Sequence, residues 1–155
     1  MSRGRPTPGR RAMIEIAHRV KVFVYRFAGG DVRYLLVRAR PRAEGLWGPI
    51  VGPIRPSEDV PRAVRRRVRE KIGVDRMEAV LDLHAVERTQ VGGLDLVEWA
   101  YACRIPGVDE PPLLLGPDLS EWCWEDFTRA YSRLEFEANR SAMLRLHTLL
   151  RADNG

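Results

Sequence analysis

The segment from Gly52 to Val74, GPIRPSEDVPRAVRRRVREKIGV, gathers the residues of this chain that are best suited to chemistry. Carboxylates one helical turn apart can hold hard divalent cations, whereas Arg and Lys can contact phosphate groups directly. A helix would place Arg67, Glu70 and Lys71 on one face, because their spacing is close to one turn. Two interpretations follow: a solvated face with intrahelical ion pairs, or a cationic surface that binds phosphate.

The residues around this group predict the helix that must position it, over residues 62–72. Asp59 is a suitable N-cap, and Gly73 is suited to the left-handed position that ends a helix. Apolar residues recur along the segment at Val64, Val68 and Ile72. This stripe is expected to be buried, which leaves residues 66, 67, 70 and 71 on the polar face.

The rest of the chain alternates strand and helix signals, which is typical of an α/β layered domain. Strands are expected at residues 21–27, 33–38, 47–51, 79–88 and 94–105, with turns at Gly29-Gly30 and Gly92-Gly93. A last helix is expected to be capped by Asn139 and to run to about Arg151. The expected fold is one mixed β-sheet flanked by helices.

The spacing of the first segment resembles the Nudix box, G-x5-E-x7-R-E-U-x-E-E-x-G-U, where U is a bulky aliphatic residue. The positions that agree are Gly52, Glu58, Arg66, Val68, Glu70, Gly73 and Val74. Arg67 and Lys71, by contrast, stand where the box has glutamates. The chain is therefore similar to the Nudix hydrolases, which implies an α/β/α sandwich with a degenerate metal site.

The resemblance implies cleavage of a nucleoside diphosphate linked to another moiety, with Mg²⁺ or Mn²⁺ as cofactor. It assigns a metal-binding carbonyl to Val51 or Gly52 and a loop-bracing ion pair to Glu58 and Arg66, with Gly73 as the third structural position. Of the acidic positions 67, 70 and 71, only Glu70 keeps its carboxylate. Replacing two negative groups by positive ones is expected to weaken Mg²⁺ binding strongly.

The resemblance extends beyond the box and looks closest to the branch of bacterial dATP pyrophosphohydrolase and dihydroneopterin triphosphate pyrophosphatase. It rests on GLWGPIVG before the box, Glu98 and Tyr101 to Pro106 in a strand, Trp124 after a loop, and Asn139-Arg140. It implies a catalytic or metal-side role for Asp118, six residues before Trp124, with Glu121 as the alternative. Arg38, Gly52, Arg67, Lys71 and Glu98 are the candidate ligand-binding residues.

Composition sets the wider limits. The chain has 155 residues, 45% of them apolar and 30% charged, which suits one globular domain over residues 13–155. Residues 1–12 carry four arginines and no acid, and we expect a disordered basic tail there. The formal net charge of +5 is partly due to this tail, so nucleic acid is not expected as a partner. With two cysteines and no long apolar run, we expect a cytoplasmic protein that does not span a membrane.

Two functional hypotheses result. In the first, the protein is impaired or inactive as a hydrolase and binds a nucleotide or other phosphorylated ligand through the cleft beside the box, with no metal required. In the second, it is an active diphosphohydrolase in which Glu70, Asp118, Glu98 or Glu121 and a backbone carbonyl hold Mg²⁺ or Mn²⁺. The second requires at least two of the additional carboxylates to lie near Glu70. Substrate identity and oligomeric state are left open by the sequence.

Overall fold

A computed structural model describes residues 15–41, 45–107 and 112–154. The tail predicted at residues 1–12 lies outside these ranges. The strands are β1 (Ile16–Ala28), β2 (Asp31–Ala39), β3 (Trp47–Gly48), β4 (Ile50–Pro53), β5 (Ala79–Val91), β6 (Leu94–Arg104) and β7 (Leu119–Glu125). The helices are α2 (Val60–Ile72), α3 (Phe127–Arg133) and α4 (Glu137–Asn154).

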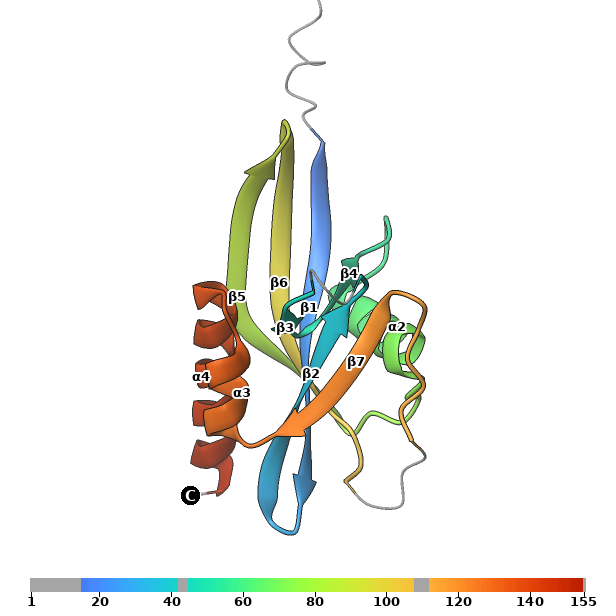
Figure 1. Cartoon of the computed structure of the whole chain (residues 1–155). Helices are drawn as coiled ribbons and strands as arrows, with labels where there is room; N and C mark the ends of the chain where they lie inside the picture. Colours follow the sequence, from blue (N-terminus) through green and yellow to red (C-terminus); the bar gives the residue numbers. More distant parts are fainter. Residues whose placement is uncertain (1–14, 42–44, 108–111, 155) are drawn as a thin grey trace, which may run out of the picture.

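The strands form one mixed sheet with the order β3-β2-β1-β6-β5 (Figure 1). One edge of β1 pairs with both β2 and β4, and its other edge pairs with β6 in parallel. β7 extends the sheet by pairing with β2. Helix α2 covers one face, and α3 and α4 cover the other (Figure 1). This arrangement is the predicted α/β/α sandwich.

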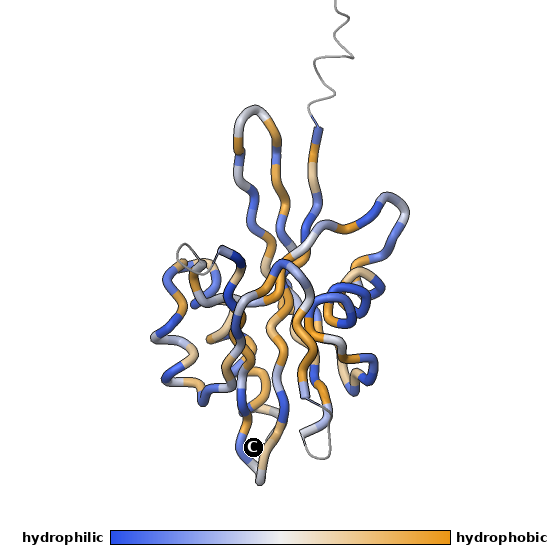
Figure 2. Tube along the Cα trace, turned by 45° about the vertical axis from the view of Figure 1, so that its right-hand side comes forward, coloured by the Kyte–Doolittle hydropathy of each residue, from blue (hydrophilic) through white to orange (hydrophobic). Residues whose placement is uncertain are grey.

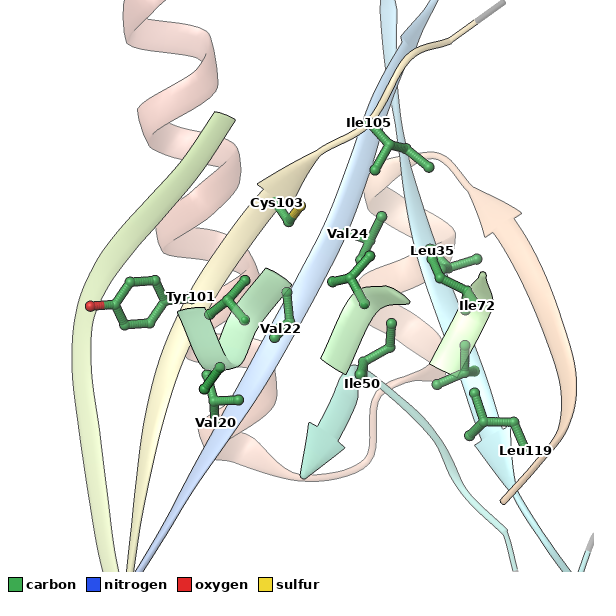
Figure 3. Packing of buried hydrophobic residues seen from close by; sticks show 14 residues of the cluster. Val20, Val22, Val24, Leu35, Ile50, Ile72, Tyr101, Cys103, Ile105 and Leu119 are labelled. Atoms are coloured by element: carbon green, nitrogen blue, oxygen red, sulfur yellow. The ribbon is translucent and has the colours of Figure 1, made fainter. Parts of the chain in front are cut away.

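Alternation along β1 separates the two faces. Val20, Val22 and Val24 belong to the apolar cluster beneath α2, whereas Phe23 and Tyr25 belong to the cluster beneath α3 and α4. Figure 3 shows the first cluster packed between the strands and α2, and Figure 2 shows hydrophobic residues concentrated along the central strands. Lys21 lies between two valines of β1 and points to the α4 face, where it donates a hydrogen bond to Asn139.

Helix α2 forms where the sequence predicts it. The Asp59 carboxylate accepts a hydrogen bond from the Arg62 backbone N–H at 2.8 Å, and Gly73 ends the helix with φ 71°. The predicted stripe of Val64, Val68 and Ile72 is fully buried. The helix is therefore held in one rotational setting against β1 and β4, and this setting fixes where its polar residues point.

Two elements of the structure differ in detail from those predicted from the sequence. The segment 47–51 is divided into β3, which pairs with β2, and β4, which pairs with β1. Pro49 separates them, since proline has no N–H to offer a strand ladder. Asn139 does not cap the last helix: α4 begins at Glu137, and the Asn139 side chain accepts a hydrogen bond from Lys21.

Helix α3 was not predicted. It begins after Asp126, whose carboxylate accepts a hydrogen bond from the backbone N–H of Arg129 at 2.9 Å, so an N-cap signal is present in the sequence. The helix has only seven residues, too few to show a clear apolar period. None of the helices in the described part of the chain combines the length and apolar character that crossing a bilayer requires.

Candidate functional site

The loop before α2 is braced by an ion pair between Glu58 and Arg66. Arg66 donates from Nε to Glu58 Oε2 and from Nη2 to Glu58 Oε1, both at 2.7 Å. Their side chains are only 12% and 10% exposed. The hydrogen bonds from Arg66 lower the pKa of Glu58 to about 2, against the effect of burial. This bidentate pair fixes the loop relative to the helix.

The Arg67 side chain turns back over the loop instead of reaching into solvent. It donates from Nε and Nη2 to the carbonyl oxygen of Pro53, at 3.1 and 2.9 Å, and from Nη1 to Glu70 Oε1 at 3.0 Å. Only 15% of the side chain is exposed. Burial, followed by the neighbouring Arg66, lowers the pKa of Arg67, yet a guanidinium stays charged at neutral pH. A permanent cation thus lies between a backbone carbonyl and the remaining carboxylate of the box.

Gly52 provides the space that Arg67 occupies. A Cβ atom at Gly52 would lie 2.5 Å from Arg67 Nε and 2.6 Å from its Cδ, so a side chain there would have to displace the arginine. Gly52 itself pairs with Val20 in the β1–β4 ladder. The carbonyl that the structure engages is that of Pro53, next to the predicted Val51 or Gly52, and its partner is a guanidinium.

Lys71 forms a second ion pair, with Asp118 in the loop before β7. Its Nζ donates to Asp118 Oδ2 at 2.6 Å. The Lys71 side chain is 14% exposed, whereas that of Asp118 is 71% exposed. This hydrogen bond and the charge of Lys71 lower the pKa of Asp118 from its usual value. Arg67 and Lys71 are thus largely covered, and the intrahelical ion pair expected between Arg67 and Glu70 is present.

Arg67, Lys71 and Asp118 line one end of a cleft of about 680 Å³. The cleft runs from α2 past the short strands β3 and β4 to the first turn of α4, and its other residues include Arg19, Trp47, Phe136 and Asn139. Phe136 is 60% exposed. A volume of this size is typical of small-molecule sites. The lining of the cleft combines charged groups with aromatic rings and an amide.

Glu98 and Glu121 do not join this group. Glu98 lies on the opposite face of the sheet, in a separate hollow beside α4, where its Oε1 is 3.9 Å from Lys21 Nζ. Glu121 accepts a hydrogen bond from Arg38 Nη1 at 2.9 Å. The Arg38 guanidinium lies over the ring of Trp47, which packs in the cluster beneath α3 and α4. The carboxylates that the second hypothesis needs are therefore not brought together around Glu70.

Enzymes of the Nudix family generally use divalent metals, so the donor set must be compared with that requirement. In the ranges that the structure describes, no three carboxylate, His or Cys side chains are grouped to hold a metal ion. Glu70 contacts both Arg66 and Arg67, and Asp118 contacts Lys71. In this arrangement Glu70 and Asp118 each face a cation, so a Mg²⁺ or Mn²⁺ ion held by them would have to displace these contacts.

Sequence reasoning missed three groups at the cleft: Arg19, Phe136 and the side chain of Asn139. The sequence pattern assigns Asn139 to helix capping, and with Arg140 to the family resemblance, but not to the cleft, since an Asn before an apolar helical stripe is a common N-cap. No local pattern identifies Lys21 as its partner, because 118 positions separate the two residues in the sequence. A lysine among valines in a buried strand is nevertheless a signal, since a buried ammonium requires polar partners.

The model of the NUDIX domain matches residues 17–146, and the chain belongs to this family. Among similar solved structures is the Caenorhabditis elegans Ap4A hydrolase in a binary complex, with 18% identity and a TM-score of 0.74, covering 88% of this chain and 98% of that one. The Escherichia coli dihydroneopterin triphosphate pyrophosphohydrolase has 18% identity and a TM-score of 0.68, covering 81% and 91%. The predicted family is confirmed, and a structure from the predicted branch shares the fold.

Two further similar proteins are a solved structure with a bound ligand and a curated enzyme. The NUDIX domain of Shewanella oneidensis NrtR, solved as a complex with ADP ribose, has 16% identity and a TM-score of 0.71, covering 94% of both chains. A curated octanoyltransferase from Myxococcus xanthus is 29% identical over 128 residues. That match covers 81% of this chain but 35% of the relative, so the chain spans about a third of that protein's length.

Proposed function

We propose that this Nudix domain binds a phosphorylated ligand, with nucleotides as the leading class, and that its metal-dependent hydrolysis is strongly impaired. The observation that carries the proposal is that Arg67 and Lys71, which occupy two glutamate positions of the box, both line the cleft. Each of these cations is paired with a carboxylate, Glu70 or Asp118. The protein's own cations there supply the positive charge that a divalent metal supplies in active relatives.

Both cations keep hydrogen-bonding capacity for a ligand. A guanidinium has five N–H donors, and Arg67 uses three in its bonds to Pro53 and Glu70. An ammonium has three donors, and Lys71 uses one in its bond to Asp118. Asp118 is largely exposed, so it can turn into solvent when an anion approaches Lys71. A diphosphate can therefore bind both side chains without first breaking the Arg67 contacts.

A bound metal ion, unlike a phosphate group, would be repelled by Arg67 and Lys71. Two unit charges about 4 Å apart interact by roughly 4 kcal/mol at an effective dielectric of about 20, and a divalent ion doubles this repulsion. Solvent and side-chain motion reduce the value, but the sign is fixed by the cations at positions 67 and 71. The ligand's phosphate groups are attracted by the same field that repels Mg²⁺. This asymmetry favours binding over hydrolysis.

The test is calorimetric titration of ADP and inorganic pyrophosphate in the presence of EDTA, which removes any contribution of metal. We expect both to bind, and we expect Arg67→Gln and Lys71→Gln each to raise the Kd about tenfold, because each removes charge-assisted hydrogen bonds. Arg62→Gln is the matched control: it removes the same charge from the same helix, and its side chain is 81% exposed. This control should leave the Kd unchanged.

The opposing result is also defined. Turnover of a nucleotide panel in Mg²⁺ at ordinary enzyme rates, roughly 1 to 1,000 per second, would contradict the proposed impairment. Loss of that turnover in Glu70→Gln would assign it to this site and exclude a contaminating activity. Absence of pyrophosphate binding in EDTA, with no change on substituting Arg67, would contradict the proposed ligand class.

A second role is favoured by the octanoyltransferase of Myxococcus xanthus, which contains a segment similar to most of this chain. We infer that the domain works beside an octanoyl-transfer enzyme and regulates it through the ligand of its cleft. Mixing the purified chain with the octanoyltransferase encoded in the same genome should give a complex by light scattering, and ADP should change its transfer rate. In Arg67→Gln, the same effect should require about tenfold more ADP. Two separate species and an unchanged rate would contradict this role.

A further inference from the structure

Two arginines lie directly opposite each other in the hairpin formed by β1 and β2. Arg26 of β1 and Arg33 of β2 are partners in the antiparallel register, and such partners point to the same face of a sheet. This face is the one that α2 covers, because Val24, two residues before Arg26, packs in the apolar cluster beneath that helix. Like charges placed directly opposite each other repel and lower stability.

The Arg26 guanidinium lies on the indole ring of Trp124, with its Cζ 4.1 Å from the ring centroid. Its Nε is buried and has no hydrogen-bond partner among the described residues. Burial, followed by the charge of Arg33, lowers the pKa of Arg26, and no described carboxylate counters this effect. A buried donor without a partner is uncommon in folded proteins, and an ion-binding site is one of its known causes.

Arg104, at the end of β6, shows how this chain compensates a similar cation. Its guanidinium lies over the ring of Phe27, with Cζ 4.6 Å from the centroid, and its Nε is also buried without a hydrogen bond. Glu78 Oε1, however, lies 3.3 Å from that Nε and supplies the opposite charge. In the part of the chain that the structure describes, neither Arg26 nor Arg33 has such a carboxylate, so both charges remain for an external anion.

The two guanidinium groups also have donors for such an anion. In Arg26 the Nε is the buried nitrogen, and the two Nη groups carry the remaining N–H donors. Arg33 uses its Nη1 for the carbonyl oxygen of Val32, at 3.2 Å. Guanidinium forks bind phosphate oxygens in pairs. A phosphate monoester has a charge of about −1.5 to −2 at neutral pH, so one group compensates both arginines, whereas a carboxylate compensates only one.

We propose that Arg26 and Arg33, supported by Trp124, form a second phosphate-binding site, separate from the cleft beside α2. None of these three residues lines that cleft, and the hairpin that carries the arginines extends away from β3 and β4 (Figure 1). The site takes a phosphate group with two negative charges, either as the free ion or as part of a phosphorylated molecule. The anion removes the repulsion between the two arginines.

The test measures the melting temperature, Tm, of the full chain in inorganic phosphate and in chloride at equal ionic strength. The parent is the double variant Arg67→Gln with Lys71→Gln, so that phosphate bound at the cleft makes no contribution. A ligand that binds the folded protein raises its Tm, and we expect a rise of about 3 °C in the parent. Adding Arg33→Gln should remove this rise. In chloride the same change should raise the Tm by about 2 °C, because it relieves the repulsion at Arg26.

Arg104→Gln in the same parent is the matched control. It removes a cation that also lies on an aromatic ring, but one that Glu78 compensates. The Tm in chloride should therefore fall, and the response to phosphate should persist. This control also accounts for the general stabilisation by phosphate, which is excluded from protein surfaces. O-phosphoserine distinguishes the sources: a rise with both compounds supports a site for phosphorylated molecules, and a rise with inorganic phosphate alone supports a site for the free ion.

An equal rise of the Tm with and without Arg33→Gln would overturn the inference, and so would a lower Tm of Arg33→Gln in chloride. Asp109 and Glu110 lie outside the described residues, and the double variant Asp109→Asn with Glu110→Gln tests whether the chain itself supplies the opposite charge. A loss of Tm in that variant that Arg33→Gln cancels would also overturn the inference. An unchanged Tm would support it.

Discussion

Exchanging both Arg67 and Lys71 for glutamate is expected to raise the affinity of the protein for Mg²⁺. The double variant would place carboxylates at positions 67, 70 and 71 on one helical face, beside the Pro53 carbonyl and Asp118. Hard divalent cations favour such an oxygen set, and two repulsive charges become attractive. We expect the Kd for Mg²⁺, measured by calorimetry, to fall at least about tenfold, which corresponds to about 1.4 kcal/mol.

The matched control is the double variant Arg62→Glu with Arg69→Glu. It makes the same change in net charge on the same helix, but these side chains are 81% and 54% exposed and do not line the cleft. Its Mg²⁺ affinity should change little, because exposed charges are well screened. Equal gains in the two double variants would mean that net charge, and not the site, governs metal binding. No gain in either would mean that this helix face does not form the metal site.

Glu58→Gln is expected to have the largest effect on stability. The change removes the charge of the closer of the two carboxylates that contact Arg66, and leaves Glu70 at 3.3 Å. The Arg66 side chain is 10% exposed, and a buried cation that loses most of its compensating charge is strongly destabilising. We expect the free energy of unfolding, measured by urea denaturation at pH 7, to fall by about 3 kcal/mol. Asp75→Asn is the control, since this carboxylate is 80% exposed and 3.9 Å from Arg69. It should change stability by less than about 0.5 kcal/mol.

The pH dependence of this difference tests its origin. Folding lowers the pKa of Glu58 from its ordinary value of 4.5 to about 2, chiefly through the hydrogen bonds from Arg66. A carboxylate whose pKa is lowered by folding contributes stability above its unfolded pKa and loses it as the pH falls through the folded value. The difference between wild type and Glu58→Gln should therefore shrink from about pH 4.5 to about pH 2. A difference that stays constant over this range would show that packing, and not the ion pair, is responsible.

Local patterns in the sequence were sufficient for much of the fold. Helix α2 carries its cap, its apolar stripe and its terminal glycine within the segment from Asp59 to Gly73, and the two hairpins have their turns at paired glycines. The parallel pairing of β1 with β6 was not predictable in this way, because it joins Ile16–Tyr25 to a segment about 80 positions later. Such pairings depend on the packing of the whole sheet.

The candidate site was likewise predictable only in part. The residues of the box follow from their spacing, but the directions of their side chains do not. Arg67 folds back over Gly52 because a glycine there leaves room and the Pro53 carbonyl offers an acceptor. Lys71 contacts Asp118, which is 47 positions away in the sequence, and Lys21 contacts Asn139, which is 118 positions away. These contacts exist only once the strands and helices have assembled, so a reading of local patterns leaves them open.

The balance of charge around α2 also limits how this protein can evolve. Glu58, Glu70 and Asp118 face Arg66, Arg67 and Lys71, so carboxylates and cations are equal in number. A single step from Arg67 to glutamate would place it beside Glu70 and leave the space over Gly52 unfilled, before a complete metal site exists to offset the repulsion. The same holds for Lys71 next to Asp118. Without a bound metal, each single step from this charge balance toward a glutamate-rich box is therefore disfavoured.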